Sequence, residues 1–257
     1  MNRLDILFKS KPANVLNIYC TAGFPNIDST PQVMLALQQA GADIIEIGIP
    51  YSDPIADGPV IQQSNMQALE NGMTIDLLFT QLLSVKDQLT VPVILMGYVN
   101  PVLQYGVDKF CEAAAEAGVS GVILPDLPMY EYEQLYKAVF EKHGLHSIFL
   151  ISPVTSKQRI KKADELSNGF LYAVSSSSTT GSVNRSEDKA GYFNKIKHMN
   201  LRNPVLIGFG IKDNESFNQA AAHAAGAIIG TAYIQQIANS TDIYASTSQF
   251  LAAILGK

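Results

Sequence analysis

The sequence predicts an α/β fold, a single parallel barrel of the TIM type, from three observations. Short apolar runs rich in β-branched residues alternate eight times with segments of helical periodicity, which is typical of βαβ units and a parallel sheet. The chain has 257 residues, the usual size of an eight-unit barrel. No linker or change in composition divides it, so we expect one barrel domain over residues 1–257.

The expected elements follow from these runs in chain order. Strands are expected at residues 15–20, 44–49, 91–98, 121–124, 147–151, 170–174, 205–208 and 227–229. Helices are expected at residues 2–9, 29–40, 62–69, 75–89, 106–117, 130–143, 156–166, 187–199, 214–224 and 232–255, the last with a break near 239–241. The helix at 2–9 precedes the first strand and is an addition to the barrel.

An open, doubly wound sheet is the alternative architecture. Such sheets usually carry a glycine-rich fingerprint after the first strand. Gly23 stands alone at that place in this chain. We therefore favour the closed barrel, whose active sites lie in the loops at the carboxyl ends of the strands.

Composition and charge exclude several classes of function. The net charge is −5 and there is no basic block, which argues against nucleic acid as a main partner. No apolar run approaches the ~18 residues that a membrane span needs, and the first residues lack an apolar core of signal-peptide length. Cys20 and Cys111 fit no metal or redox spacing, and the four histidines form no cluster. We expect no metal, no membrane contact and a reduced, cytoplasmic location.

The segment ADIIEIGIPYSDPIADGP at residues 42–59 carries one carboxylate in a predicted strand and two in the loop after it. Glu46 interrupts an apolar strand, where a carboxylate is expensive to bury unless it has a partner or a chemical role. Asp53 and Asp57 follow in the next loop. Carboxyl groups in different environments can hold different protonation states at one pH, as acid/base catalysis requires. The plain alternative is that Glu46 pairs with a lysine or a backbone amide and that the two aspartates cap turns.

The barrel would bring these groups together. Glu46 lies towards the end of the second strand, Asp57 in the loop after it, and Tyr172 near the end of the sixth strand. All three can converge over one mouth of the barrel. Tyr19, Tyr98 and Phe209 could line an apolar pocket there, or could be ordinary core residues.

Glycines in three consecutive loops predict a phosphate site. Gly208-Phe209-Gly210-Ile211 follows the seventh strand, Gly230-Thr231-Ala232 follows the eighth, and Thr180-Gly181 lies in the loop after the sixth. Barrels often bind phosphate in these loops, where glycine lets backbone N–H groups approach an anion. The alternative is that these glycines only make tight turns. With the carboxylates and the apolar pocket, they suggest an aromatic substrate with a phosphorylated tail.

The same segments resemble one known family. The stretch IEIGIPYSDPIADGPVIQ is similar to the signature of tryptophan synthase α chains. The resemblance continues through YCTAGFP (19–25), MGYVNP (96–101), LPDLP (124–128), YAVSSSSTTG (172–181), GFGI (208–211) and GTA (230–232), and so covers nearly the whole chain.

The resemblance implies a TIM barrel that cleaves indole-3-glycerol phosphate to indole and glyceraldehyde 3-phosphate, without a cofactor, in tryptophan biosynthesis. It implies an α subunit that works in an αββα complex and passes indole to a β subunit. Glu46 falls on the catalytic glutamate, Asp57 on the catalytic aspartate, and Tyr172 on a tyrosine beside the glutamate. The remaining implied positions are the phosphate-binding Gly181, Gly210, Gly230 and Thr231, the indole-surrounding Tyr19, Tyr98 and Ile123, and the β-facing Asp53 and Pro54.

Two positions depart from the family pattern. Ser178 stands where many members have glycine, so the loop after the sixth strand has one flexible residue fewer. Thr231 replaces a more usual serine and keeps the hydroxyl.

Two other functions compete with this one. A stand-alone lyase would release free indole, and a regulatory subunit would have lost catalysis. Retention of the Ser52-Asp53-Pro54 sequence favours a subunit with a partner, and retention of Glu46 and Asp57 argues against loss of catalysis.

Overall fold

The sheet closes on itself, as a barrel requires. The computed structural model describes residues 1–174, 187–208 and 210–257. In these ranges every strand pair is parallel, and the order is β5-β4-β3-β2-β1-β9-β8-β7-β6. The strands are β1 Val15–Thr21, β2 Ile44–Gly48, β3 Val93–Met96, β4 Val119–Ile123, β5 His146–Ser147, β6 Leu150–Ile151, β7 Leu171–Val174, β8 Val205–Gly208 and β9 Gly226–Ile229.

The two ends of this order, β5 and β6, are pieces of one chain segment. β5 pairs with β4 and β6 pairs with β7. Between them, the Ile148 amide donates to the Val122 carbonyl oxygen (3.1 Å), and the Phe149 carbonyl oxygen accepts from the Tyr172 amide (3.0 Å). The strand expected at 147–151 is thus split in two and joins both edges. The barrel prediction is confirmed, and the open-sheet alternative is wrong because no edge is left free at this segment.

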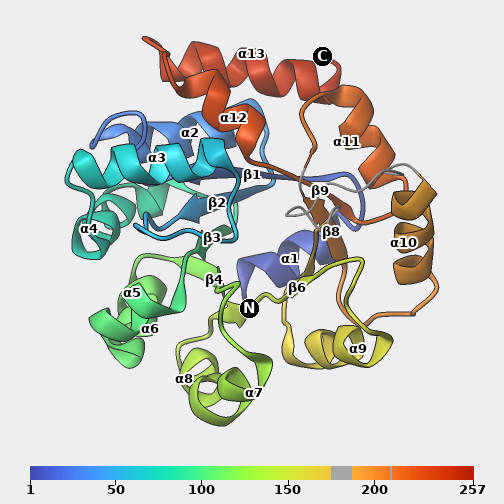
Figure 1. Cartoon of the computed structure of the whole chain (residues 1–257). Helices are drawn as coiled ribbons and strands as arrows, with labels where there is room; N and C mark the ends of the chain where they lie inside the picture. The colour runs from blue at the N-terminus through green and yellow to red at the C-terminus, as the bar shows by residue number, and fades with distance from the viewer. Residues whose placement is uncertain (175–186, 209) are drawn as a thin grey trace.

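Helices surround the sheet in a ring (Figure 1). Their bounds are α1 Arg3–Ser10, α2 Ser29–Ala40, α3 Pro59–Glu70, α4 Ile75–Val85, α5 Val99–Tyr105, α6 Val107–Glu116, α7 Met129–Glu131, α8 Lys137–Lys142, α9 Lys157–Leu166, α10 Glu187–Lys197, α11 Asn214–Ala221, α12 Thr231–Ile237 and α13 Ile243–Leu255. A 3-10 turn at Lys86–Gln88 extends α4, and a π-helical turn at Tyr132–Tyr136 joins α7 to α8.

The expected helices are present, with one addition. Sequence periodicity did not predict α5, because the apolar run at 91–98 leads directly into it and Pro101 interrupts the pattern. Proline is tolerated there because it lies in the first turn, where a helix lacks internal N–H partners. The expected long C-terminal helix is broken between Ile237 and Ile243, as predicted.

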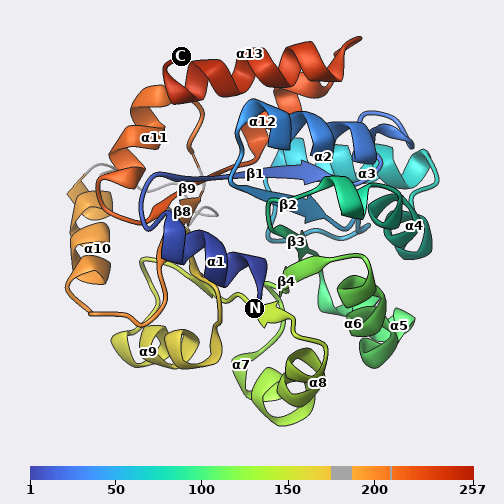
Figure 2. The ribbon, with the colours of Figure 1, turned by 180° about the vertical axis from the view of Figure 1, so that it is seen from behind.

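The helix α1 closes the amino-terminal end of the barrel and lies in front of the strands in Figure 2. Leu4 is fully buried, and Phe8 packs against Phe170 with ring centroids 6.0 Å apart. The Asn2 side-chain amide donates to the carbonyl oxygens of Ser120 and Gly144. Because α1 blocks this end, a ligand must reach the barrel interior from the carboxyl ends of the strands.

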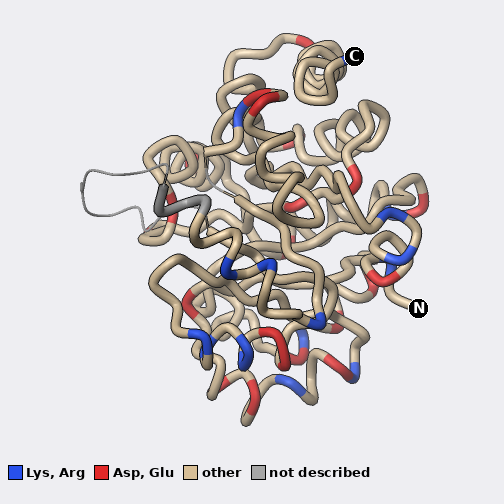
Figure 3. The backbone as a smooth tube through the Cα atoms, turned by 90° about the vertical axis from the view of Figure 1, so that its right-hand side faces the viewer, with Lys and Arg blue, Asp and Glu red and all other residues tan. Residues whose placement is uncertain are grey.

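Charges of both signs mix along the helices on the side seen in Figure 3. This distribution agrees with the net charge of −5 and the absence of a basic block in the sequence. None of the helices in the described ranges is long and apolar enough to cross a membrane.

Candidate active site

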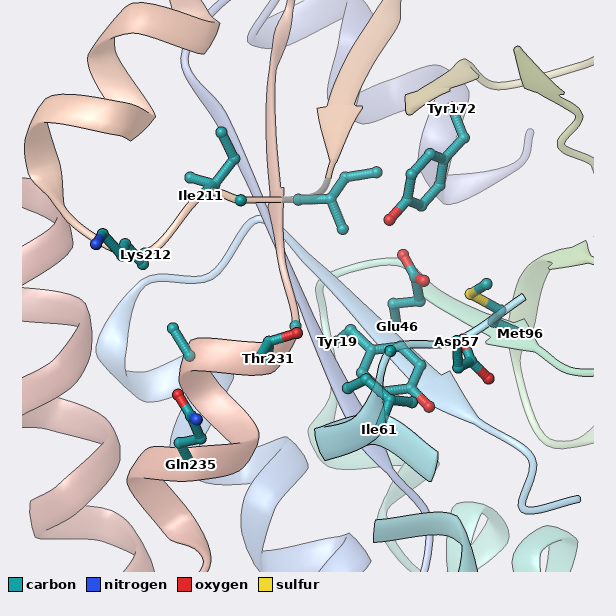
Figure 4. Close-up of a pocket in the computed structure, with 15 residues that line it drawn as sticks. Tyr19, Glu46, Asp57, Ile61, Met96, Tyr172, Ile211, Lys212, Thr231 and Gln235 are labelled. Carbon is teal, nitrogen blue, oxygen red and sulfur yellow. The ribbon is translucent and has the colours of Figure 1, made fainter. Parts of the chain in front are cut away.

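A cavity of about 300 Å³ opens at the carboxyl ends of the strands (Figure 4). Its lining comes from strands β1, β2, β3, β7 and β9, from the loops that follow β2, β8 and β9, from the first turn of α3 and from α12. The lining residues are Tyr19, Glu46, Asp57, Gly58, Ile61, Met96, Tyr172, Gly210, Ile211, Lys212, Ile228, Gly230, Thr231, Ala232 and Gln235. This volume suits a small-molecule ligand.

Glu46 is fully buried in the middle of β2 and faces the cavity. The Asn17 side-chain amide Nδ2 donates to Glu46 Oε2 at 2.6 Å. Oε1 has no hydrogen-bond partner among the described residues. Burial raises the pKa of Glu46 to about 8; the Asn17 hydrogen bond opposes this shift, and the negative charge of Asp57 adds to it. The carboxyl group is therefore mostly protonated at neutral pH.

Asp57 lies in the loop between β2 and α3, on the opposite wall from Tyr172 (Figure 4). The Tyr98 hydroxyl donates to Asp57 Oδ2 at 3.2 Å and accepts from the Ala56 backbone amide at 3.0 Å. Burial raises the pKa of Asp57 to about 6, while the Tyr98 hydrogen bond lowers it. Asp57 is thus mostly ionised at neutral pH, when Glu46 is mostly protonated.

Two tyrosines complete the walls near Glu46. The Tyr172 hydroxyl points toward the Glu46 carboxyl group, and Tyr19 lies beside Glu46 on the neighbouring strand (Figure 4). Burial raises the pKa of both tyrosines well above the ordinary value, so both stay protonated. Each ring lies against a glycine on the adjacent strand, where a Cβ atom would overlap it: Gly48 beside Tyr19 and Gly208 beside Tyr172. These two glycines make the space that the rings occupy.

The far end of the cavity is formed by the loops after β8 and β9. Gly210 has a φ of +80°, in the left-handed region that favours glycine. Gly230 and Thr231 lie at the start of α12, and Lys212 and Gln235 complete this end (Figure 4). The Thr231 hydroxyl and the glycine backbone are suitable groups for an anion, whereas Lys212 is exposed and its amine points away from Thr231 in Figure 4.

Taken together, the cavity combines an acid, a base and an anion-suited end. Its walls carry the protonated carboxyl group of Glu46, the ionised carboxylate of Asp57 and several apolar side chains. Two carboxyl groups that environment has driven to different protonation states can donate a proton at one point and stabilise positive charge at another. Across the described part of the chain, no group of three or more His, Cys, Asp or Glu residues is placed to hold a metal ion.

Comparison with known proteins identifies the family. The model of the tryptophan synthase alpha chain family matches residues 7–255. The tryptophan synthase alpha chain of Flavobacterium psychrophilum is 49% identical over 255 residues, which cover 99% of this chain and 100% of the relative. That of Parabacteroides distasonis is 46% identical over 255 residues, 99% of each chain. The chain belongs to the tryptophan synthase alpha chain family.

Solved structures agree with this assignment. The crystal structure of tryptophan synthase subunit alpha from Legionella pneumophila has a TM-score of 0.88 and 36% identity, and the match covers 99% of this chain and 97% of that one. A chain of the tryptophan synthase complex from Pyrococcus furiosus has a TM-score of 0.86 and 30% identity, over 95% and 99% of the two chains. The recognition of the family from sequence motifs is confirmed.

The resemblance to tryptophan synthase α chains assigns a set of positions to the site. Seven of these positions line the cavity. They are Tyr19, Glu46, Asp57, Tyr172, Gly210, Gly230 and Thr231. Tyr98 lies behind the wall and contacts the cavity through Asp57. Ile123 is fully buried at the end of β4 and is not a lining residue of this cavity. Thr180, Gly181 and Phe209, and the Ser178 departure, lie outside the described residues.

The two residues expected to face a β subunit differ in exposure. Asp53 is exposed and accepts a hydrogen bond from the Ser52 hydroxyl at 2.6 Å, whereas Pro54 is buried within the chain. The neighbouring Ile55 is 81% exposed. Any partner would therefore meet Asp53 and Ile55 rather than the ring of Pro54.

Sequence reasoning missed several residues of the site. Asn17 is polar in the apolar run VLNIYCT, which was a usable signal. Lys212 follows the GFGI motif directly, and its charge could have been noted there. Met96, Ile228 and Gln235 carry no signal that separates them from ordinary core or helix residues.

Proposed function

We propose that this chain cleaves indole-3-glycerol phosphate to indole and glyceraldehyde 3-phosphate, as a carbon–carbon lyase of tryptophan biosynthesis. The observation that carries the proposal is the pair formed by Glu46 and Asp57. They face one cavity, and their pKa values of about 8 and about 6 give them opposite protonation states at neutral pH. Membership of the tryptophan synthase alpha chain family supports the choice of substrate.

The reaction needs a proton donor at the indole ring. Indole is a poor carbanion leaving group, so the bond between ring carbon C3 and the glycerol chain does not break directly. Glu46, protonated, donates to C3 and converts the ring to an electrophilic indolenine-like cation. Asp57, ionised, accepts the indole N–H and stabilises the positive charge that develops there.

The same glutamate then acts as the base. The Glu46 carboxylate removes the proton of the hydroxyl on the glycerol carbon next to the ring. As that carbon forms its carbonyl bond, the C–C bond breaks and its electron pair neutralises the ring cation. Indole and the aldehyde result, and Glu46 regains its proton, so one carboxyl group serves both steps. No cofactor is required.

The phosphate of the substrate would bind at the end of the cavity near α12. Gly210, Gly230 and Thr231 are suited to an anion. Thr180, Gly181 and Phe209 would complete this subsite from outside the described residues. The indole ring would lie between Tyr19 and the apolar side chains of Ile61 and Met96.

We propose that the chain works as the α subunit of an αββα complex and passes indole to its β subunit. The exposed Asp53 and Ile55 follow directly after β2, in the loop that also carries Asp57. A stand-alone lyase remains the alternative function. A cytoplasmic location fits both, since the two cysteines are free and buried.

The test is steady-state cleavage of indole-3-glycerol phosphate with and without a tryptophan synthase β subunit. We expect slow indole release by the isolated chain and faster release with the partner. Cleavage that the β subunit does not change, together with no co-purification, would favour the stand-alone lyase. No cleavage under either condition would leave only a regulatory role.

A further inference from the structure

Asn17 is a buried polar residue that the proposed reaction has not yet used. It is fully buried in β1, among apolar neighbours. Burying an amide is unfavourable unless its hydrogen bonds are made. Its Nδ2 donates to Glu46 Oε2 at 2.6 Å, slightly shorter than the usual range for such bonds, while its Oδ1 has no hydrogen-bond partner among the described residues. The contact joins Asn17 directly to the central carboxyl group of the cavity.

Strand register places Asn17 beneath Glu46. In the β1–β2 pair, Tyr19 lies opposite Glu46 and Asn17 lies opposite Ile44. Residues two apart on a strand face the same side of a sheet, so Asn17 and Tyr19 both point into the barrel. Asn17 is therefore one layer deeper than Glu46, and its amide reaches the carboxyl group from the amino-terminal side.

The two oxygens of Glu46 consequently have different surroundings. Oε2 is held by Asn17, whereas Oε1 has no hydrogen-bond partner among residues 1–174, 187–208 and 210–257. Native proteins rarely leave a buried carboxyl oxygen without a partner. Because Glu46 lines the cavity, Oε1 is the oxygen available to a ligand.

We infer that Asn17 is a positioning residue, which fixes Oε2 of Glu46 so that Oε1 is aimed at the reacting carbon and hydroxyl of the substrate. The inference rests on the proposed function for what Oε1 meets. The anchoring of Oε2 depends only on the geometry of the ligand-free protein.

The charged and titratable groups around Glu46 give Asn17 a second effect. Asp57 faces it from the loop after β2, Tyr19 from β1 and Tyr172 from β7, while the Cys20 thiol lies nearby on the other face of β1. None of these four groups carries a positive charge that could stabilise a Glu46 carboxylate. The Asn17 amide does stabilise it, and so opposes the rise in pKa caused by burial and by Asp57. Without the amide, the carboxylate needed for the second step of the reaction becomes less accessible.

The direct test is titration of Glu46 in the ligand-free full chain. Carboxyl carbon-13 NMR of glutamate-labelled protein follows the group, and Glu46→Gln identifies its signal. Asn17→Val removes the amide and keeps a side chain suited to a strand. We expect the pKa of Glu46 to rise by about 1–2 units, since a hydrogen bond to a charged group is removed.

A kinetic measurement tests the positioning itself. In Asn17→Val we expect kcat for indole-3-glycerol phosphate to fall about tenfold or more, with KM within about twofold of wild type. The alkaline limb of the kcat/KM profile, which reports the free enzyme, should move up by the same interval as the NMR titration, because the reaction begins with protonated Glu46. A role in folding alone would leave that limb in place.

Asn203→Val is the matched control. Asn203 Nδ2 donates to Asp164 Oδ1 at 2.9 Å, the same kind of amide-to-carboxylate contact. It precedes β8 and lies at the amino-terminal end of the barrel, away from the cavity. This variant should lose stability and keep the Glu46 titration and the alkaline limb of wild type.

The outcomes separate this inference from the proposed function. If wild type does not cleave the substrate, the proposed function fails, and the NMR titration still tests the anchoring of Glu46. If wild type is active and Glu46 titrates as before in folded Asn17→Val, the inference is overturned. A shifted titration with unchanged kcat would overturn the positioning role. If Asn17→Val does not fold, Asn17→Ala takes its place, and failure of both would mark Asn17 as purely structural and overturn the inference.

Discussion

Glu46 and Asp57 differ in burial and in their hydrogen-bond donors. Glu46 is fully buried and has one amide donor, while Asp57 is partly exposed and bonded by a tyrosine hydroxyl. Burial raises both pKa values, to about 8 and about 6. We propose that this difference gives Glu46 the role of acid and Asp57 that of charge stabiliser.

The raised pKa of Glu46 has a consequence for stability. Between about pH 4.5 and 8, folded Glu46 keeps a proton that the unfolded chain has released. The free energy of unfolding therefore falls as pH rises through this range. The Glu46→Gln variant has no titratable group at this position, so its free energy of unfolding should fall less over the same range. Between pH 4.5 and pH 8, its free energy of unfolding relative to wild type should rise by roughly 2–5 kcal/mol.

Urea unfolding followed by circular dichroism at several pH values measures this difference. Glu112→Gln, on the exposed face of α6, is the control and should follow wild type at every pH. If wild type and Glu46→Gln changed in parallel from pH 4.5 to pH 8, Glu46 would not be protonated in the folded chain.

Residue by residue, the sequence predicted the charged groups better than their partners. Glu46 was predicted as functional because a carboxylate in an apolar strand is unusual. For Tyr98, the sequence predicts only a place beside the indole ring of the substrate and gives no sign of its contact with Asp57. That contact depends on how the loop after β2 folds back over β3, which no local pattern specifies. The Asn17–Glu46 bond depends on strand register, which likewise appears only when the barrel closes.

At the scale of elements, the loop from β2 to α3 is held by β3. Tyr98, two residues after β3 and at the N-cap of α5, hydrogen-bonds the Ala56 amide and the Asp57 carboxylate, and its ring packs on Tyr51 with centroids 5.2 Å apart. At the other end of the loop, the Gln62 side-chain amide donates to the Asp57 carbonyl oxygen at 2.9 Å. These contacts fix Asp57 against the cavity.

Tyr98→Phe should therefore loosen the loop while keeping the ring. We expect kcat/KM to fall about tenfold, and the acidic limb of the profile to move to higher pH, because the hydroxyl that lowers the pKa of Asp57 is gone. Steady-state kinetics from pH 5 to pH 9 measures both effects. Tyr105→Phe is the matched control, since its hydroxyl bonds the exposed Asp76 at 2.9 Å. Equal losses in both variants would mean that the effect is not specific to the loop.

Element prediction succeeded where periodicity was clear and failed where tertiary contacts decided. The strands at β1, β2 and β8 agree with their expected ranges to within one residue. The split of the expected fifth strand into β5 and β6 reflects pairing with different neighbours, β4 and β7, at its two ends. α5 was missed because its sequence continues an apolar run and contains Pro101.

On the scale of the whole molecule, one end of the barrel is closed by a helix and the other end holds the cavity. α1 covers the amino-terminal end (Figure 2). The cavity opens at the carboxyl ends of the strands, and the loop that contributes Asp57 to it also carries the exposed Asp53 and Ile55. One loop thus contributes Asp57 to the cavity and Asp53 to the outer surface. We propose that a β subunit bound to this surface adjusts the position of Asp57 through the loop, and positioning of that kind can supply several kcal/mol of barrier reduction.

Asp53→Ala should keep the basal rate within about twofold and reduce the acceleration by a β subunit several-fold. Asp53 contacts Ser52 and does not line the cavity, so the basal chemistry does not depend on it. Rates of indole formation with and without the β subunit measure the effect, and Asp28→Ala, on the loop before α2, serves as the control. Full acceleration of a well-folded Asp53→Ala chain would exclude this coupling.

The most direct test of the account is the pH dependence of kcat/KM for indole-3-glycerol phosphate in wild type, Asp57→Asn and Glu46→Gln. We expect a bell-shaped profile for wild type, with limbs near pH 6 and pH 8, because Asp57 must be ionised and Glu46 protonated. Asp57→Asn should lose the acidic limb. Its alkaline limb should move to lower pH, because the charge of Asp57, which raises the pKa of Glu46, is gone. Glu46→Gln should fold and lose at least ~10²–10⁴-fold in rate. A flat wild-type profile, or a Glu46→Gln variant with near wild-type turnover, would contradict the account.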